Sequence, residues 1–475
     1  MEGKNQSTNI FIVGIVLAVL TFWLFAQSMI NIIPAIQKDL GVSLGMLNIS
    51  TSLSSLFSGL FIVAAGGLSD RAGRKKLTYI GLTLSIVGCL LIIFSQSATL
   101  LIIGRAIQGI SAACIMPATI ALVKSAFEGK DRQRALSYWS FGSWGGGGST
   151  ALVGGAIATY MGWRWIFVVS IGIALLSMFL LKNIQESKAD EQSKEKFDFT
   201  GFFLFIIMML MFNMIVTRGQ DFGWTSPLTL GLIGGALATI GIFFAVERKK
   251  KHQFIEFSLF KTKAYTGAVV SNFLQNGIAA TVVVANTYIQ LARGFTSFQT
   301  GLLTIGNVIA VVVMIRVGEK MLQKMGARRP MLIATFLASL GMSMTAMTFL
   351  PDLIYIIVVF AGFLISGIGL GMYATPSIDI AVMNIPEARV GAASGIYKMA
   401  SSLGFSFGIA ITTAVYGVLE AVGSIHVAAS IGILFHLVFA IPAMIFVSKT
   451  IQPDEGKEKS VQAIQVNKKL VVQQD

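Results

Sequence analysis

Residues Gly66–Lys76 read Gly-Gly-Leu-Ser-Asp-Arg-Ala-Gly-Arg-Lys-Lys and separate two long apolar runs. An apolar run of about 20 residues is long enough to cross a membrane as a helix, so this stretch is predicted to connect two spanning helices. Gly66 and Gly67 let the first helix end tightly, and Gly73 permits a turn that a side chain would hinder. The fold is therefore predicted to consist of membrane-spanning helices joined by short charged loops.

The charges of this connection also indicate a function. Asp70 can face the positive N-terminal end of a neighbouring helix, and Arg71 and Arg74 can meet carboxylates or anionic headgroups. We interpret the connection as a charged latch at one membrane face, formed by Gly67, Asp70, Arg71, Gly73 and Arg74. A plain basic loop on the inner side of the membrane is the alternative interpretation.

The composition is that of a membrane protein. Of the 475 residues, 55% are hydrophobic and only 12% are charged, about half the charged share of soluble domains. The net charge of +14 lies in short loops between apolar runs, so the predicted partner is the lipid surface and not nucleic acid. Cys89 and Cys114 fall within apolar runs and the three histidines lack ligand spacing, which argues against disulfides and metal sites.

Runs of about 20 apolar residues predict fourteen spanning helices. The predicted spans are 10–34, 47–67, 77–96, 99–124, 135–160, 164–183, 198–217, 227–247, 264–291, 299–319, 330–350, 353–383, 392–419 and 427–448. With the N-terminus inside, the external segments hold four of the 36 lysines and arginines, and the internal segments hold 29. Because positive residues gather on the cytoplasmic side, both termini are predicted to face the cytoplasm.

Two polar linkers divide the chain. The predicted order is a six-helix bundle at 1–185, a cytoplasmic linker at 186–197, an inserted helix pair at 198–247, a second linker at 248–263, a second six-helix bundle at 264–450 and a cytoplasmic tail at 451–475. The inserted pair contains almost no deep polar residue. It is therefore predicted to pack at the periphery of the two bundles and to line no cavity.

An internal repeat supports two matching bundles. The pattern from Leu68 to Lys75 is echoed from Met321 to Arg328, in the loop after the second helix of the last six, although the echo lacks the acid. Transporters are commonly built from repeated halves around a site at the membrane midplane. The chain also shows no nucleophile triad, phosphate loop or paired carboxylate typical of an enzyme. The repeat therefore favours a transporter.

Ionisable residues inside a span cost about 3 kcal/mol or more and need a reason. Asp379 is the one acid placed well inside a predicted span, just after Pro376, and Lys398 lies in the next helix at a similar depth. The two are predicted to pair, with Asp379 alternating between the lysine and a proton. A permanent structural ion pair near the cytoplasmic interface is the alternative.

Uncharged polar residues gather on predicted helix faces in the first and ninth spans. The residues predicted to line a substrate cavity are Gln27, Asn31, Trp139, Asn272, Gln275 and Asn276. Hydrogen bonding between helices is the alternative role for the amides.

The whole chain except its tail resembles the fourteen-helix drug:proton antiporter family of the major facilitator superfamily. The likeness rests on the Gly66–Lys76 connection, on the series Arg105–Ala113 in the fourth span and on Gly162–Phe167. Within that family the chain is most similar to the NorB/NorC-type quinolone exporters of Gram-positive bacteria, through segments such as Phe22–Ser28 and Tyr373–Pro376.

The resemblance implies an all-α integral membrane protein with the major facilitator fold, two six-helix bundles plus two inserted helices. It implies a proton-coupled, monomeric exporter of amphipathic drugs (quinolones, dyes and cationic biocides) in the cell membrane, with no cofactor besides the proton gradient. It also implies a part in proton coupling for Arg105; a structural arginine bonded to backbone carbonyls is the alternative. Alternative functions are transport of an endogenous metabolite, or a non-transporting sensor or channel.

Overall fold

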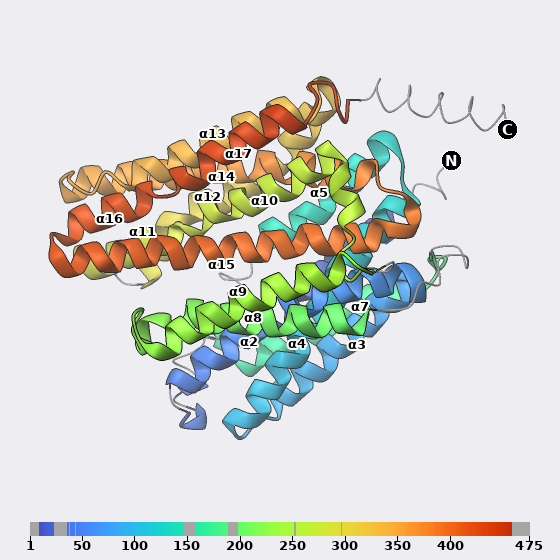
Figure 1. Cartoon of the computed structure of the whole chain (residues 1–475), viewed down its shortest axis with the longest axis horizontal. Coiled ribbons are helices and arrows are strands. Elements are labelled where there is room, and N and C mark those ends of the chain that lie inside the picture. The colour runs from blue at the N-terminus through green and yellow to red at the C-terminus, as the bar shows by residue number, and fades with distance from the viewer. Residues whose placement is uncertain are drawn as a thin grey trace.

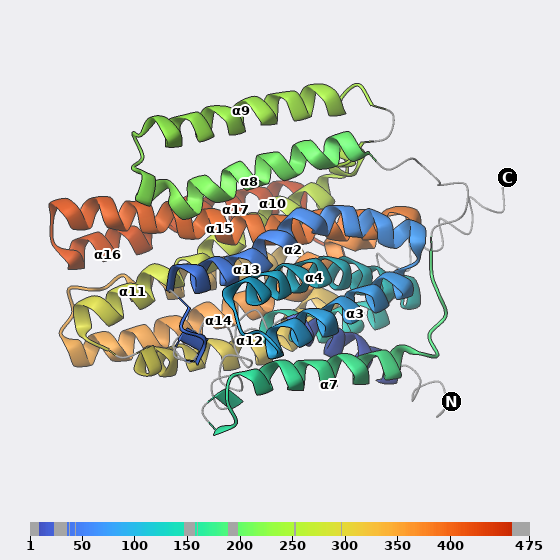
Figure 2. The ribbon, with the colours of Figure 1, turned by 90° about the horizontal axis from the view of Figure 1, so that it is seen from below.

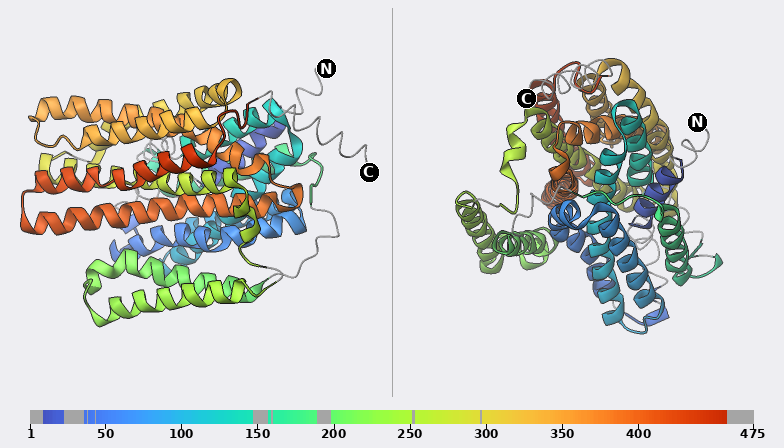
Figure 3. Two further views of the ribbon diagram at one scale, coloured as in Figure 1. Left: turned by 45° about the horizontal axis from the view of Figure 1, so that its top comes forward. Right: turned by 90° about the vertical axis from the view of Figure 1, so that its right-hand side faces the viewer.

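The computed structural model describes residues 9–22, 36–37, 39–42, 44–146, 157–158, 160–188, 198–250, 253–295 and 297–457. Throughout these residues the regular secondary structure is helical, and the long helices run roughly along one axis of the molecule (Figure 1). Seen along that axis, the helices form two groups, with a green pair to one side (Figure 3).

The first group is formed by the N-terminal helices. Their apolar stretches are helical because, in a membrane, the backbone N–H and C=O groups of such a stretch must form hydrogen bonds with one another. Its elements are the helix Asn9–Phe22, α2 (Leu44–Ala72), α3 (Arg74–Ile93), α4 (Ala98–Ala126), α5 (Gly129–Ser140) with the π-helical turn η1 (Phe141–Gly145), and α7 (Arg164–Leu181).

The second group repeats this plan. Its elements are η3 (Phe257–Lys261), α10 (Lys263–Ala280), α11 (Val282–Arg293), α12 (Ser297–Met325), α13 (Arg328–Thr345), α14 (Asp352–Met383), η4 (Glu387–Arg389), α15 (Val390–Val422), α16 (Ile425–Leu434) and α17 (Leu437–Thr450). In both groups the second and third long helices are separated by one or two residues only, α2 from α3 by Gly73 and α12 from α13 by Gly326 and Ala327.

Between the groups the chain forms α8 (Phe199–Phe222) and α9 (Pro227–Glu247). Aromatic side chains attach α8 to both groups: Phe212 stacks on Phe407 of α15 with ring centroids 4.1 Å apart, and Phe202 meets Phe61 of α2 at 5.6 Å. Helix α9 lies beyond α8 at the edge of the molecule in Figure 2. This peripheral position agrees with the prediction for the inserted pair, while the predicted segment boundaries remain predictions.

Ten helical segments in the described part of the chain are long and apolar enough to cross a membrane. Asn9–Phe22 and Phe199–Phe212 are shorter apolar helices. The structure therefore agrees with an all-helical, multi-pass membrane protein, and the count of fourteen spans stays a prediction.

The two groups meet where α2 approaches α15. A Cβ atom added to Gly66 would overlap the carbonyl oxygen of Gly391, and one added to Gly391 would overlap the hydroxyl of Ser69. The glycines thus let two backbones touch, as small residues do between membrane helices. This contact lies at the end of the molecule where α2 finishes and α15 begins, on the right in Figure 1, called the Asp70 end below.

Candidate functional site

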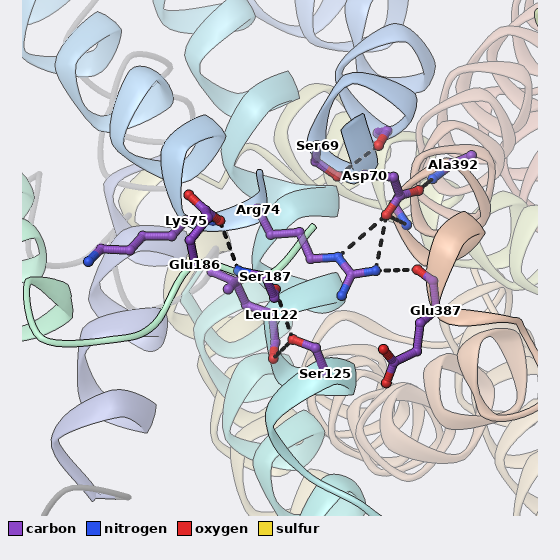
Figure 4. Close-up of polar contacts among 12 residues, drawn as sticks. Ser69, Asp70, Arg74, Lys75, Leu122, Ser125, Glu186, Ser187, Glu387 and Ala392 are labelled. Carbon is purple, nitrogen blue, oxygen red and sulfur yellow. Dashed lines mark hydrogen bonds and ion pairs between the residues drawn. The ribbon is translucent and has the colours of Figure 1, made fainter. Parts of the chain in front are cut away.

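Asp70 caps a helix that belongs to the other group. Its carboxylate accepts hydrogen bonds from the backbone N–H groups of Gly391 (2.9 Å) and Ala392 (3.0 Å), in the first turn of α15 (Figure 4). Those N–H groups have no partner within their own helix, and the helix dipole favours a negative charge there. Asp70 is 3% exposed. In the structure, Asp70 thus faces the N-terminal end of a neighbouring helix.

Arg74 completes this contact from the same side as Asp70. Its guanidinium lies 3.2 Å from the Asp70 carboxylate and also donates to the carbonyl oxygen of Glu387, just before α15. Gly73, with φ of 112°, makes the turn that places Arg74 one helical turn beyond Asp70. The guanidinium therefore neutralises Asp70 and bonds to the opposite group at once.

The other two residues assigned to the latch do not join it in the structure. Arg71 is exposed at the end of α2. A Cβ atom added to Gly67 would meet open space, whereas Gly66, one residue earlier, makes the close approach to α15. A helix turns 100° per residue, so neighbouring positions face different surroundings.

The segment after α7 seats on the same loop. The carboxylate of Glu186 accepts from the backbone N–H groups of Lys75 and Lys76, both at 2.9 Å, and caps the start of α3 (Figure 4). The N–H of Arg74 donates to the carbonyl oxygen of Ser187 at 3.0 Å. A Cβ atom on Gly73 would lie 2.6 Å from the Glu186 carboxyl carbon, so glycine is required for this seating.

A second contact joins the two groups at the same end. Asp379, near the end of α14 and 0% exposed, accepts from Arg132 Nε at 2.9 Å and from Gln133 Nε2 at 3.1 Å. Both donors lie in the first turns of α5. Lys124, at the end of α4, adds a hydrogen bond to the carbonyl oxygen of Met383 at 3.0 Å. Each group thus contributes a buried carboxylate that is held by the other.

The predicted pair of Asp379 with Lys398 is wrong for this structure. The Lys398 ammonium lies 5.3 Å from the ring centroid of Trp139 and 3.5 Å from the hydroxyl of Ser143. Equal depth on adjacent helices brings two side chains together only when both point to a shared face. Asp379 and Lys398 instead point to different turns of the same partner region, Asp379 to the start of α5 and Lys398 to its end.

A further acid lies within a helix, contrary to the expectation that Asp379 stood alone. Glu319 is 2% exposed in α12 and forms an ion pair with Arg316, and Gln323 Nε2 donates to it at 3.1 Å. The predicted span ended at 319, but α12 continues to Met325. The end of the apolar run was therefore not the end of the helix.

Arg105 is buried inside the first group. Its guanidinium donates to the carbonyl oxygen of Ser50 (3.3 Å), the hydroxyl of Ser54 (2.7 Å) and the side-chain oxygen of Gln108 (3.0 Å). These bonds tie α4 to α2, which is the arrangement expected for the structural alternative.

The predicted cavity residues have different surroundings. Asn272 donates to Tyr397 O (3.0 Å) and Ser401 Oγ (2.6 Å) of α15, and Asn276 donates back to Asn272. These two amides therefore form hydrogen bonds between and within helices. Gln275, by contrast, is 0% exposed with neither amide atom hydrogen-bonded within the described chain. Gln27 and Asn31 lie outside the described residues.

Trp139 lies at the boundary between the groups. It is 1% exposed, donates from Nε1 to Thr119 Oγ1 at 2.9 Å and carries the Lys398 ammonium over its ring. An ammonium ion above an indole is attracted by the ring's negative face. Trp139 thus places a cation from the second group against the first group.

The family model of the Major Facilitator Superfamily matches residues 11–249 and 266–472. The chain belongs to the major facilitator superfamily. The quinolone resistance protein NorB of Staphylococcus aureus strain JH9 is 50% identical over 432 residues, which cover 91% of this chain and 92% of NorB. NorB of strain COL is 48% identical over 446 residues, 94% of this chain and 96% of that one.

Solved structures of other major facilitator proteins share the fold. The proton:xylose symporter XylE bound to 6-bromo-6-deoxy-D-glucose has a TM-score of 0.69 at 15% identity, covering 97% of this chain and 99% of XylE. The human organic anion transporter MFSD10 has a TM-score of 0.63 at 13% identity, covering 93% and 99%. The predicted major facilitator fold is confirmed.

In this major facilitator protein, sequence reasoning missed Arg132 and Gln133. The fifth span was predicted to begin at 135, and the charges before it were counted with the loop. The structure starts α5 at Gly129, so Arg132 and Gln133 lie within the helix and are 4% and 1% exposed. A signal was present: Gln133, Leu136 and Ser140 recur at helical spacing, which extends the helix face toward Gly129.

Proposed function

We propose that the chain is a proton-coupled, secondary active exporter of amphipathic drugs, such as quinolones, dyes and cationic biocides, working by alternating access. The observation that carries the proposal is the pair of reciprocal, buried carboxylate contacts between the two groups at one end of the molecule. A transporter needs such contacts to form in one state and break in the other. The NorB proteins, half identical over nearly the whole chain, supply the drug class.

The Asp70 end is proposed to face the cytoplasm, with both termini on that side. The connections at this end carry most of the lysines and arginines, and positive loops stay inside. The contacts of Asp70 and Asp379 then close the cytoplasmic side. The protein is proposed to act as a monomer surrounded by membrane lipids, because the repeated halves supply both sides of the pathway in one chain.

Asp379 is proposed to link closure to proton release. The two groups of helices are the two halves of the transporter. The hydrogen-bond partners that the structure gives Asp379 both belong to the other half, so Asp379 loses them when the halves separate. Asp70 keeps Arg74, which comes from its own half. A carboxylate without its cation favours protonation. Deprotonated Asp379 is therefore required for cytoplasmic closure, and its release of a proton to the cytoplasm permits closure around bound drug.

Lys398 and Arg105 remain in this coupling proposal with different roles. Lys398 is a cation at the boundary between the two groups of helices, over Trp139, and is proposed to take part in coupling from that position. Arg105 holds α4 on α2 and so transmits movement within the first half. Gln275 is proposed for the drug cavity, since a buried amide with unused hydrogen-bonding atoms is costly unless a ligand or water serves it.

Dye transport in inverted membrane vesicles with an imposed pH gradient tests the proposal. The parent chain is expected to drive dye into vesicles whose lumen is acidic. Asp379→Asn is expected to bind the dye but to lose gradient-driven uptake, and Lys76→Gln, an exposed lysine nearby, serves as the control. Dye uptake that ignores the gradient would contradict proton coupling. If the Asp379→Asn chain takes up dye at the full rate, a residue other than Asp379 must carry the proton.

A further inference from the structure

The segment after the last helix, Gln452–Lys457, reaches the contact between the halves through Gly456. The carbonyl oxygen of Gly456 accepts a hydrogen bond of 2.7 Å from Gln133 Nε2, the same group that donates to Asp379. Gly456 is buried, and a Cβ atom added to it would lie 2.7 Å from Leu322 and 3.7 Å from the Asp379 carboxylate. A residue of the C-terminal segment therefore touches the first half directly.

The rest of the segment is seated on its own half. Glu455 accepts from the N–H of Ala327 through its carbonyl oxygen (2.8 Å) and from Asn384 through its carboxylate (3.3 Å). A Cβ atom on Gly326 would overlap the carbonyl oxygen of Pro453. Gly456 itself has φ of 81°, which side chains rarely adopt. This geometry defines a fitted turn in contact with two loops.

The internal repeat gives this seating a counterpart. Gly73 and Arg74 correspond to Gly326 and Ala327 in the repeated pattern. In the first half the N–H of Arg74 bonds to Ser187, just after the sixth helix; in the second half the N–H of Ala327 bonds to Glu455, again after the sixth helix. Each half thus places the segment after its last helix on the loop between its second and third helices.

The two halves then differ in one respect. The counterpart of Asp70 is Gln323, whose amide donates to Glu319 within its own helix; among the described residues no hydrogen bond joins it to the other half. In each half, the fifth helix is the one that the opposite half contacts. Asp70 of the first half caps α15. Gln133 of α5 donates to Gly456 and to Asp379 of the second half. In the second half it is Asp379 and the carbonyl oxygen of Gly456 that meet the fifth helix of the other half.

We propose that Gln452–Lys457 is part of the cytoplasmic latch, a positioning segment that seats between the halves when they close and leaves when they open. It supplies from Gly456 a backbone acceptor for Gln133, beside the side-chain acceptor that Asp379 supplies. This role rests on the proposed function, because it assigns the closed side to the cytoplasm.

The test measures closure directly, without drug or gradient. A reporter cysteine replaces Ser137, one helical turn deeper than Gln133 and 2% exposed. A membrane-impermeant maleimide is added to inverted vesicles, and its rate of reaction with the full-length chain is recorded. The chain without the reporter gives the background from Cys89 and Cys114, which are buried.

Gly456→Val is expected to raise the labelling rate about fivefold, the factor expected for one lost hydrogen bond. Gly172→Val is the matched control, since its added atoms would meet open space. Gly456→Ala, strained in the same way but smaller, keeps the test available if the valine chain is not inserted. Equal labelling in the Gly456 and Gly172 variants would overturn the role of the segment. If dye uptake is normal in that case, the proposed export still holds and only the role of the segment fails. If the parent chain instead shows no gradient-driven uptake, the proposed export fails, whatever the labelling rates show about the segment.

Discussion

Replacing Asp70 by asparagine is the sharpest perturbation of the first contact, because it removes a charge with almost no change in volume. The carboxylate now accepts two N–H groups of α15 and the Arg74 guanidinium. An asparagine offers one acceptor oxygen and turns a donor amide toward the remaining N–H group. Arg74, 1% exposed, is left with the Glu387 carbonyl as its acceptor across the boundary.

The expected cost follows from these losses. A hydrogen bond to a charged group contributes about 1.5–3 kcal/mol, and the helix terminus adds about 0.5 kcal/mol. The smaller desolvation penalty of a neutral side chain offsets part of this. We expect closure to weaken by about 2 kcal/mol, which is about a 30-fold change in the closing equilibrium. The structure thus predicts a large effect from a substitution that leaves the packing intact.

The reporter at position 137 measures this change. Asp70→Asn is expected to raise the maleimide labelling rate in inverted vesicles by about 30-fold if the parent is mostly closed. It is also expected to lower gradient-driven dye uptake while the amount of inserted protein is unchanged. Lys76→Gln is the control, since Lys76 is exposed. Unchanged labelling in Asp70→Asn would refute the reasoning, because the contact would then not stabilise closure.

Three further predictions concern the same end of the molecule. Gly391→Val is expected to abolish dye uptake and give the highest labelling rate, because any Cβ there overlaps the Ser69 hydroxyl; parental labelling would refute it. Arg132→Gln is expected to shift the closing equilibrium about 100-fold toward the open state, because it leaves the buried charge of Asp379 unpaired. In a double-mutant cycle, adding Asp379→Asn is expected to restore much of the lost closure, measured by the labelling rate at position 137. Burial raises the pKa of Glu455, against the lowering effect of the Gln452 N–H. Proton binding to Glu455 therefore favours the seated segment, and seating weakens as the cytoplasmic pH rises through the raised pKa. Glutamine resembles the protonated acid. In the Glu455→Gln chain, the reporter at position 137 is therefore expected to label more slowly than in the parent at high pH and equally fast at low pH.

Much of the helical plan could be predicted from the sequence, because a membrane helix must satisfy its backbone within one continuous apolar run. Sequence reasoning was weaker at helix ends. From the sequence, the charged residues that flank the apolar runs are assigned to loops. In the structure, however, α5 already begins at Gly129 and α12 continues to Met325. At a membrane face, helices can extend past the apolar run because water and partner charges serve their polar side chains.

The Asp70 contact was predictable because its partner is a helix terminus, which presents free N–H groups whatever residues form it. The partner of Asp379 was not predictable in the same way. Asp379 meets a specific side chain, Arg132, that is 247 positions away in the sequence. That choice depends on how two bundles dock, and equal depth in a hairpin pointed to Lys398 instead.

This difference gives the two contacts separate tasks. The Asp70 contact uses backbone donors, and Asp70 keeps Arg74 beside it when the halves part, so its charge remains compensated in both states. Asp379 is compensated by Arg132 and Gln133 of the opposite half and loses both on opening. A ligand shifts a conformational equilibrium only through different affinities for the two states. A proton has a larger difference at Asp379, which loses both partners on opening, than at Asp70, which keeps Arg74. In the proposed mechanism the Asp70 contact therefore mainly sets the strength of closure, and the Asp379 contact mainly makes closure depend on the proton.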